Sequence, residues 1–350
     1  MSTLATLGWG PYFSAQLSSE EASTLLVGRV VADRGRRLRL RFEAGDRLVI
    51  VPGHLLGAEP APVAGDFVLA APGEPPVVAR VLERRSALSR NAAGRATVEQ
   101  VLAANVDLVL VVQGLDEGAH PRRLERTLAA VHASGAEPAV ILTKADLVPD
   151  AGAALAEARA AASGAPVLLA SGVSGEGLDG LAGLVGPGRT AVFVGPSGAG
   201  KSTLVNALLG RAEQPVAAVR ARDARGRHTT TARRLFELPG GGCVIDGPGI
   251  RELRLWDAGG IAAAFDDVAA LAAGCRFRDC RHAGEPGCAV AGAVEAGRLD
   301  AGRLESLRKL EREAALQEAR RGGAAARAEK LRWRPIKKAQ RRMYRDRDRG

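Results

Sequence analysis

The sequence predicts an α/β protein that contains an N-terminal OB-fold β-barrel, a domain with a doubly wound sheet, and a C-terminal, mostly helical segment. Short β-branched strands fill the region before residue 84, apolar runs alternate with helical stretches after residue 100, and a Cys/His cluster begins at residue 275. A chain of 350 residues is longer than a domain with a single hydrophobic core normally is, so more than one domain is expected. The expected divisions are 1–23 (a poorly structured lead-in), 24–84 (barrel), 85–256 (α/β domain), 257–320 (helical domain with the Cys/His cluster) and 321–350 (basic arm).

The barrel is predicted from five short segments that alternate apolar and polar residues and are separated by Gly, Pro and Asp. This many short strands in so short a region is typical of an OB-fold. Such barrels often bind nucleic acid, but the pattern fits equally a barrel with no ligand of its own. The expected strands are 25–31, 37–42, 47–51, 66–71 and 77–82.

The next region has the pattern of a parallel sheet that is covered by helices on both faces. The run at 106–113 is almost continuously apolar, as expected for a strand buried on both sides. Further apolar runs alternate with helical stretches, which indicates a doubly wound sheet. The expected strands are 106–113, 138–143, 166–171, 191–195 and 242–247, and the expected helices are 121–134 and 150–163.

A glycine-rich loop follows the strand 191–195 and precedes a helical pattern. It matches G-x-x-x-x-G-K-[ST], in which backbone N–H groups surround phosphate oxygens at the start of a helix. Lys201 is expected to reach the β- and γ-phosphates and to act in catalysis, and Ser202 to offer its hydroxyl to Mg²⁺. The predicted phosphate-binding set is Gly195, Pro196, Ser197, Gly198, Ala199, Gly200, Lys201, Ser202 and Thr203.

Two further segments are candidates for reading a guanine base. TKAD, at the end of an expected strand, is similar to the [N/T]-K-x-D motif of GTPases. There the carboxylate, here Asp146, accepts hydrogen bonds that adenine cannot provide, and Lys144 packs along the base. Thr143 replaces the commoner Asn, so we expect one amide contact to be lost and GTP affinity to be lower. The loop ASGVSGEGL is the expected companion, with Ser171 beside the guanine oxygen. The alternative is an ordinary turn at a strand end.

The D-x-x-G motif of the γ-phosphate switch runs from Asp246 to Gly249. Asp246 is expected to hold Mg²⁺, and the Gly249 N–H to contact the γ-phosphate. The segment GRHTTT offers a threonine for Mg²⁺, which we assign to Thr230. Ile250 stands where related enzymes place a Gln that orients the attacking water, so His228 is the candidate for that catalytic role. The alternative is an exposed loop histidine that contacts RNA or solvent.

The motifs occur in permuted order. In ordinary small GTPases the phosphate loop comes first, whereas here the guanine motifs at 143 and 171 precede the phosphate motifs at 195, 230 and 246. Independent matches in one coherent order predict a circularly permuted P-loop GTPase domain that binds GTP or GDP with Mg²⁺. An ATPase would explain the phosphate loop but would leave the guanine motifs without a role.

Three of the four cysteines lie close together in the sequence, beside a histidine. In a cytosolic protein this favours a metal site over disulfides. Three thiolates and one imidazole complete a tetrahedral Zn²⁺ shell, so we expect one structural zinc per chain. Buried, unligated cysteines are the alternative, which the surrounding arginines disfavour, whereas Cys243 is expected in the core. The predicted ligands are Cys275, Cys280, His282 and Cys288.

The formal net charge of +10 is concentrated at the C-terminal end. Residues 301–350 contain 17 Lys/Arg and 7 Asp/Glu, so the first 300 residues contain 32 of each. This favours an arm that binds nucleic acid, with a solubilising tail as the alternative. No apolar run approaches the roughly 20 residues that span a membrane, and the N-terminus lacks the pattern of a secretory signal. We therefore expect a cytoplasmic monomer that does not associate with membranes.

The permuted motifs, the barrel before them and the Cys/His cluster after them resemble the family of ribosome small-subunit-dependent GTPase A (RsgA, also called YjeQ). The resemblance includes GPSGAGKSTLVN, GRHTTT, DGPGIREL and CRFRDCRHAGEPGC. It implies an OB-fold, a permuted GTPase domain and a zinc domain, and it supports His228 as the catalytic residue. It also implies binding to the small (30S) ribosomal subunit with its 16S rRNA, a role in late maturation, and GTP hydrolysis that the subunit stimulates.

Two alternatives to this function remain open. One is an RNA-binding assembly factor that uses GTP as a structural ligand with negligible hydrolysis, which the isoleucine after DGPG permits. The other is a nucleotide-dependent factor that acts on other RNA or on DNA, which the basic arm permits.

Overall fold

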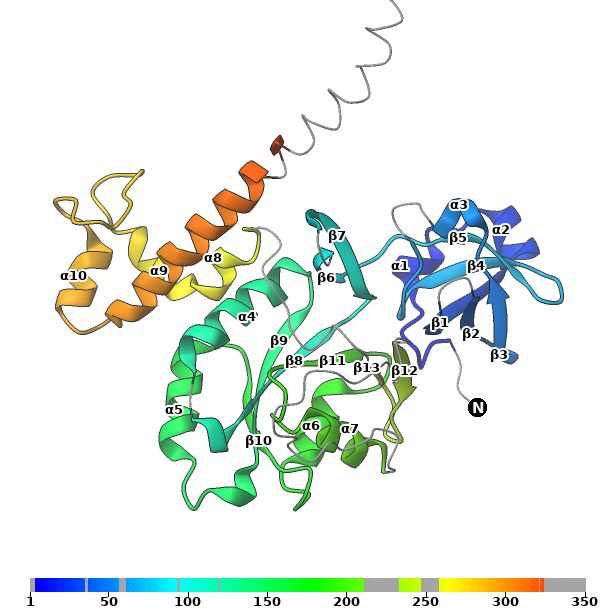
Figure 1. Cartoon of the computed structure of the whole chain (residues 1–350), viewed down its shortest axis with the longest axis horizontal. Coiled ribbons are helices and arrows are strands. Elements are labelled where there is room, and N and C mark those ends of the chain that lie inside the picture. The colour runs from blue at the N-terminus through cyan, green and yellow to red at the C-terminus, as the bar shows by residue number, and fades with distance from the viewer. Residues whose placement is uncertain are drawn as a thin grey trace, which may run out of the picture.

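The computed structural model describes residues 4–34, 37–56, 61–92, 95–118, 120–210, 233–246, 258–320 and 322–323. The barrel lies at one side of the molecule, the α/β domain in the middle and the helical region beyond it (Figure 1). In the described residues, one hydrogen-bonded sheet of eleven strands runs through both the barrel and the α/β domain.

The barrel has the five predicted strands. They are β1 Leu26–Arg34, β2 Arg37–Phe42, β3 Gly45–Ile50, β4 Phe67–Ala71 and β5 Val77–Val81, with the short helix α3 at Gly53–Leu56. The first strand pairs with both β2 and β4, which curls the sheet on itself. Burial alternates along β2, so that its apolar residues face the core and its arginines face outward. This confirms the predicted barrel.

The N-terminal lead-in is packed against the barrel, so the expectation that it is poorly structured is wrong for residues 4–23. It contains the helices α1 Pro11–Ser14 and α2 Ser19–Thr24. The Phe13 side chain is buried, and its ring centroid lies 4.4 Å from that of Phe67 in β4. Helices this short are not stable alone. Their order therefore depends on aromatic contacts with the barrel, which sequence periodicity does not reveal.

A β-hairpin connects the barrel to the α/β domain, and the sequence did not predict it. Its strands are β6 Ala87–Ala92 and β7 Arg95–Ala104, which form a separate two-stranded sheet. Leu88 and Leu102 are fully buried and attach the hairpin to the main core.

The α/β domain has the predicted alternation of strands and helices. Its strands are β8 Leu108–Gly114, β9 Glu137–Thr143, β10 Val167–Ala170, β11 Thr190–Val194, β12 Arg234–Glu237 and β13 Cys243–Asp246. Five of them are parallel in the order β10-β9-β8-β11-β13, and β12 lies antiparallel between β13 and β1 of the barrel.

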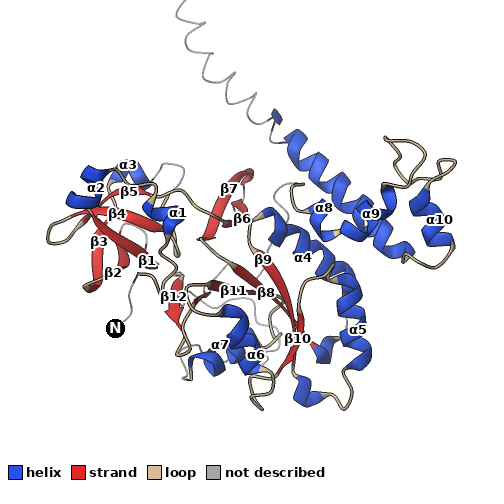
Figure 2. Ribbon diagram, turned by 180° about the vertical axis from the view of Figure 1, so that it is seen from behind, coloured by secondary structure: helices blue, strands red, loops and turns tan. Residues whose placement is uncertain are grey.

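Helices cover both faces of this sheet (Figure 2). The helices are α4 Pro121–Ala133, α5 Gly152–Ala161, α6 Leu178–Val185 and α7 Lys201–Leu209, with short 3-10 turns η1 Leu115–Glu117 and η2 Ala145–Leu147. Alternate residues of β8 enter two separate cores: Val109 and Val111 pack with α4 and α5, whereas Leu108 and Leu110 pack with α6 and α7. The doubly wound prediction is confirmed, because β8 is buried along its whole length.

The C-terminal region is mostly helical, as predicted. It contains α8 Ile261–Ala264, α9 Asp266–Ala272 and α10 Ala289–Glu295, and residues 301–320 are also helical. Its apolar residues share one core with α4 and α5, so this region packs directly on the α/β domain. Among the described residues, no helix combines the length and apolarity needed to cross a membrane.

Candidate functional site

The predicted phosphate loop lies between β11 and α7, at the carboxyl end of a central strand. Gly195, Gly198 and Gly200 have φ angles of 147°, 86° and 86°, which side chains other than glycine rarely adopt. A Cβ on Gly195 would lie 2.3 Å from the carbonyl oxygen of Val112. Other residue types would strain the loop at all three positions through φ, and at Gly195 through this contact as well.

Lys201 begins α7, and its side chain lies along the loop. It is 8% exposed, and its Nζ donates hydrogen bonds to the carbonyl oxygens of Gly195, at 2.7 Å, and Pro196. Ser202 and Thr203 follow it in the first turn of the helix. The ammonium group and the N-terminus of the helix therefore place positive charge at the same loop.

Thr143 links the guanine motif to the phosphate loop. It ends β9 and is 2% exposed, and its hydroxyl donates to the carbonyl oxygen of Ala199 at 2.6 Å. The sequence pattern indicated that an amide contact is lost at this position, but it did not reveal that the threonine hydroxyl contacts the loop. The two motifs are therefore fixed relative to each other through one side chain.

We expect Thr143→Val to weaken GTP binding about tenfold, because it leaves the buried Ala199 carbonyl without its donor. Equilibrium titration with a fluorescent GTP analogue measures this. Thr127→Val is the matched control, since that hydroxyl also bonds to a backbone carbonyl, that of Arg123, but does so on the outer side of α4. Thr143→Asn should restore affinity, and an unchanged affinity in Thr143→Val would contradict the link.

The two segments predicted to read guanine lie in contact with each other. The Ser171 hydroxyl donates to the Asp146 carboxylate at 2.5 Å and accepts from the N–H groups of Val173 and Ser174 at 3.2 and 3.1 Å. The carboxylate therefore lies beside a loop whose backbone N–H groups converge. This geometry suits a base that offers N–H donors on one edge and a carbonyl oxygen beside them.

Lys144 has a partner that the sequence analysis missed. Its φ angle is 63°, and its ammonium group pairs with Asp116 in η1, just after β8. The signal available in the sequence was an acidic residue at the carboxyl end of the neighbouring strand, where the sheet places it beside the TKAD segment. The ion pair fixes the lysine at the edge of the candidate base site.

The switch residues are described only in part. Asp246 ends β13, which pairs in parallel with the strand that leads into the phosphate loop, with Val192 opposite Ile245. This register brings the carboxylate to the same edge of the sheet as the loop. The other predicted residues of the switches, His228, Thr230 and Gly249, lie outside the described residues.

The four predicted metal ligands converge, with their ligand atoms all within 4.8 Å of one another. They are Cys275, Cys280, His282 and Cys288. The Nδ1 atom of His282 lies 3.6 Å from the Cys275 sulfur and 3.5 Å from the Cys288 sulfur, and these sulfurs are 3.9 Å apart. A tetrahedral zinc shell requires about 3.8 Å between sulfurs and about 3.6 Å between sulfur and nitrogen. The cluster can therefore hold a metal ion, and its spacing fits zinc.

Cys243 lies apart from this cluster, as predicted. It is 1% exposed within β13, and burial raises the pKa of its thiol to about 11. At neutral pH it is a neutral core side chain.

Comparisons with known proteins agree with this geometry. The RsgA GTPase family model matches residues 81–256. The small ribosomal subunit biogenesis GTPase RsgA of Opitutus terrae is 43% identical, over 97% of both chains, and that of Streptomyces coelicolor is 45% identical, over 89% of this chain and 87% of its own.

Solved structures share the fold. The crystal structure of YjeQ from Thermotoga maritima superposes with a TM-score of 0.64 at 26% identity, covering 83% of this chain and 99% of that one. YloQ, a circularly permuted GTPase, superposes with a TM-score of 0.60 at 22% identity, covering 83% of this chain and 95% of that one. The permuted order predicted from the sequence is therefore confirmed at the level of the fold.

Proposed function

The chain belongs to the RsgA GTPase family, and on that basis we propose that it acts in biogenesis of the small ribosomal subunit by hydrolysing GTP to GDP. The observation that carries the proposal is the contact between the two motifs of the site, in which Thr143 of the guanine motif bonds to Ala199 of the phosphate loop. One continuous site can then read a guanine base and hold its phosphates.

We assign the following roles to the chain's own residues. Asp146 selects guanine over adenine, with Ser171 and the N–H groups of its loop at the guanine oxygen. Lys201 and the loop amides neutralise charge that develops on the transferred phosphoryl group. Ser202, Asp246 and Thr230 would hold Mg²⁺, which would neutralise negative charge on the phosphates. His228 orients the attacking water.

The test is GTP hydrolysis by the purified protein, alone and with small ribosomal subunits, with ATP as the control. We expect slow turnover alone, strong stimulation by small subunits, and no comparable turnover of ATP. Without stimulation the protein would be a GTP-binding RNA factor with negligible hydrolysis. Equal turnover of ATP would contradict the assignment of Asp146.

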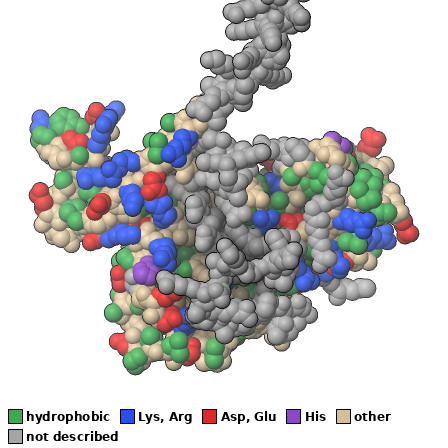
Figure 3. Space-filling model, in the orientation of Figure 1, with side chains coloured by type: hydrophobic (Ala, Val, Ile, Leu, Met, Phe, Trp, Pro, Cys, Tyr) green, Lys and Arg blue, Asp and Glu red, His purple; other side chains and the backbone are tan. Residues whose placement is uncertain are grey.

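The partner surface is proposed to be ribosomal RNA of the small subunit. Figure 3 shows Lys and Arg side chains gathered over the C-terminal helical region. Exposed arginines there include Arg276, Arg278, Arg281, Arg298 and Arg312. Phosphate contacts would provide most of the affinity and make binding fall steeply with salt. We further propose that the protein acts as a monomer in the cytoplasm, where small subunits mature.

The Cys/His cluster is proposed to hold one structural zinc ion. We expect Cys280→Ala to reduce bound zinc from about one per chain to a small fraction, because three ligands no longer close the shell. Metal analysis of the purified protein measures the loss, and limited proteolysis should then cleave between residues 275 and 288. Cys243→Ala is the control and should keep its zinc. Full zinc occupancy in Cys280→Ala would contradict the assignment.

A further inference from the structure

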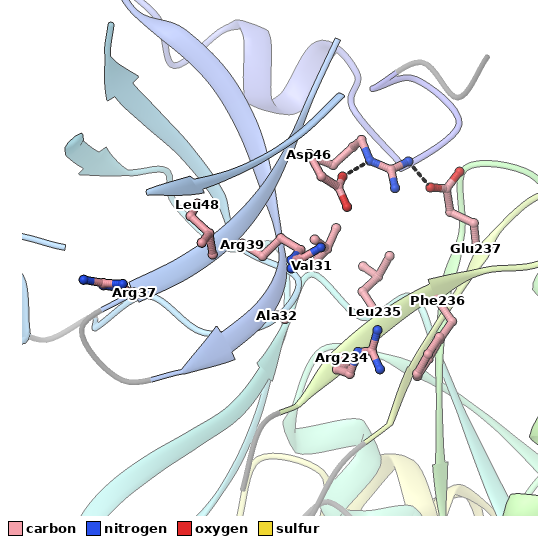
Figure 4. A pocket seen from close by; sticks show the side chains of 11 residues that line it. Val31, Ala32, Arg37, Arg39, Asp46, Leu48, Arg234, Leu235, Phe236 and Glu237 are labelled. Atoms are coloured by element: carbon pink, nitrogen blue, oxygen red, sulfur yellow. Dashed lines mark hydrogen bonds and ion pairs between the residues drawn. The ribbon is translucent and has the colours of Figure 1, made fainter. Parts of the chain in front are cut away.

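A groove lies at the seam where the barrel meets the α/β domain. It has a volume of about 350 Å³, and its walls come from β1, β2 and β3 of the barrel and from β12 of the α/β domain (Figure 4). The backbone seam itself is one residue pair, Ala32 with Arg234. None of the residues assigned to GTP or to zinc lines this groove.

Ion pairs fix the two walls relative to each other. Before β12 begins, the Arg233 N–H donates to the Asp33 carboxylate of β1 at 3.0 Å. At the other end of β12, Arg41 of β2 forms ion pairs with both Asp46 and Glu237. Dashed lines mark these two contacts in Figure 4. The groove is therefore preformed, which reduces the ordering cost of binding a ligand.

The groove carries positive charge without matching negative charge. Arg37, Arg39 and Arg234 are exposed, and none of them pairs with a carboxylate in the part of the chain that the structure describes. The two acidic residues of the lining, Asp46 and Glu237, are both occupied by Arg41. The free arginines therefore attract an anionic ligand.

Each free arginine of β2 stands beside an exposed apolar side chain. Arg37 and Arg39 are on one face of the strand, about 6.8 Å apart along it. Directly opposite them in β3 are Ile50 and Leu48, which are 42% and 51% exposed. An unpaired nucleic-acid strand presents a phosphate and an open base face at every nucleotide, whereas a duplex hides its base faces. The alternation of charge and apolar surface fits the unpaired strand.

We propose that this seam groove binds an unpaired RNA strand, with its phosphates on Arg37, Arg39 and Arg234 and one base against Leu48. The next base would lie against Ile50, which is beside the groove on the same face of β3. The inference rests on the proposed action on ribosomal RNA and names the form of RNA that the groove accepts. In the sequence, β12 joins the GRHTTT segment to the strand that ends in Asp246. A strand in the groove would thus contact the barrel and the GTPase domain at once.

The test uses a fluorescein-labelled oligouridylate of about ten nucleotides, within the site size of one OB-fold. Binding to the full-length protein is measured by fluorescence anisotropy at several KCl concentrations. We expect the double variant Arg39→Gln, Arg234→Gln to bind about tenfold more weakly, with the salt slope reduced by about 1.4 for two lost phosphate contacts. Arg159→Gln, at an exposed arginine on α5, is the control and should change affinity less than about twofold.

Other results would overturn the proposal. These are no binding of the oligouridylate by the unmodified protein, equal binding by the double variant, or an equal loss in Arg159→Gln. If a duplex of the same length, or polyglutamate, competed more strongly than the unlabelled single strand, the groove would bind that class of ligand and the proposal would be wrong. GTP affinity of each variant is the check on folding. Failure of the proposed function is visible separately, as absence of subunit-stimulated hydrolysis in the unmodified protein.

Discussion

Replacing Lys201 by Ala is expected to lower subunit-stimulated GTP hydrolysis about a thousandfold. The ammonium group lies over the phosphate loop, where it donates to the carbonyl oxygen of Gly195 at 2.7 Å and to that of Pro196. Alanine provides neither the charge nor the donors, so charge on the transferred phosphoryl group would be less well neutralised. Single-turnover hydrolysis, with the protein and small subunits in saturating excess over GTP, separates this loss from weaker binding.

Two further variants make this prediction specific. Lys201→Arg keeps the charge, but its planar guanidinium does not fit a site that holds a compact ammonium group, so we expect it to be nearly as slow. Arg159→Ala removes an exposed cation on α5, outside the GTP site and the helical region, and should leave the rate unchanged. A Lys201→Ala protein that kept more than about a tenth of the wild-type rate would show that the loop does not hold the reacting phosphates.

The parts of the fold that were predicted correctly are those whose burial determines where apolar residues stand in the sequence. The strand β8 is buried on both faces, so its sequence is almost continuously apolar. The strand β2 is buried on one face, so its arginines alternate with apolar residues. The phosphate loop was also predicted correctly, because the positive φ angles at 198 and 200 favour glycine and so leave a motif in the sequence.

The parts that were missed depend on contacts between segments far apart in the sequence. The order of α1 depends on Phe13 packing against Phe67, and neither residue carries a local signal of that contact. The bond from Thr143 to Ala199 joins residues 56 positions apart. The barrel and the α/β domain were treated as separate units, whereas the pair Ala32 with Arg234 joins them into one sheet. Pairing of this kind is decided by the tertiary fold.

Replacing Arg303 by Met is expected to lower the free energy of unfolding of the helical region by about 3–5 kcal/mol. Arg303 is 5% exposed and bonds to Asp267 of α9 at 2.7 Å and to Glu125 of α4 at 3.1 Å. Glu125 is itself 1% exposed, so the substitution leaves a buried carboxylate with fewer partners. Hydrogen exchange of residues 258–320, with denaturant titration, measures the change.

The same network predicts a response to acid. Burial by itself raises the pKa of Asp267, but the hydrogen bonds and charge of Arg303 outweigh it and hold the pKa below the ordinary value of 3.8. A carboxylate with a depressed folded pKa stabilises the fold above its unfolded pKa, and this contribution is lost as the pH falls through the folded pKa. Protection of residues 258–320 should therefore decrease below about pH 3.8 in the wild type, and this step should be smaller in Arg303→Met.

A double variant distinguishes the buried ion pair from simple loss of packing. Adding Glu125→Leu to Arg303→Met removes both buried charges, so most of the lost stability should return, since an apolar pair no longer leaves a carboxylate without its partner. Arg298→Met, at an exposed arginine of the same region, is the matched control and should be nearly neutral. If the double variant were as unstable as Arg303→Met alone, the guanidinium would act through its packing on Phe265, whose ring centroid it approaches at 4.7 Å.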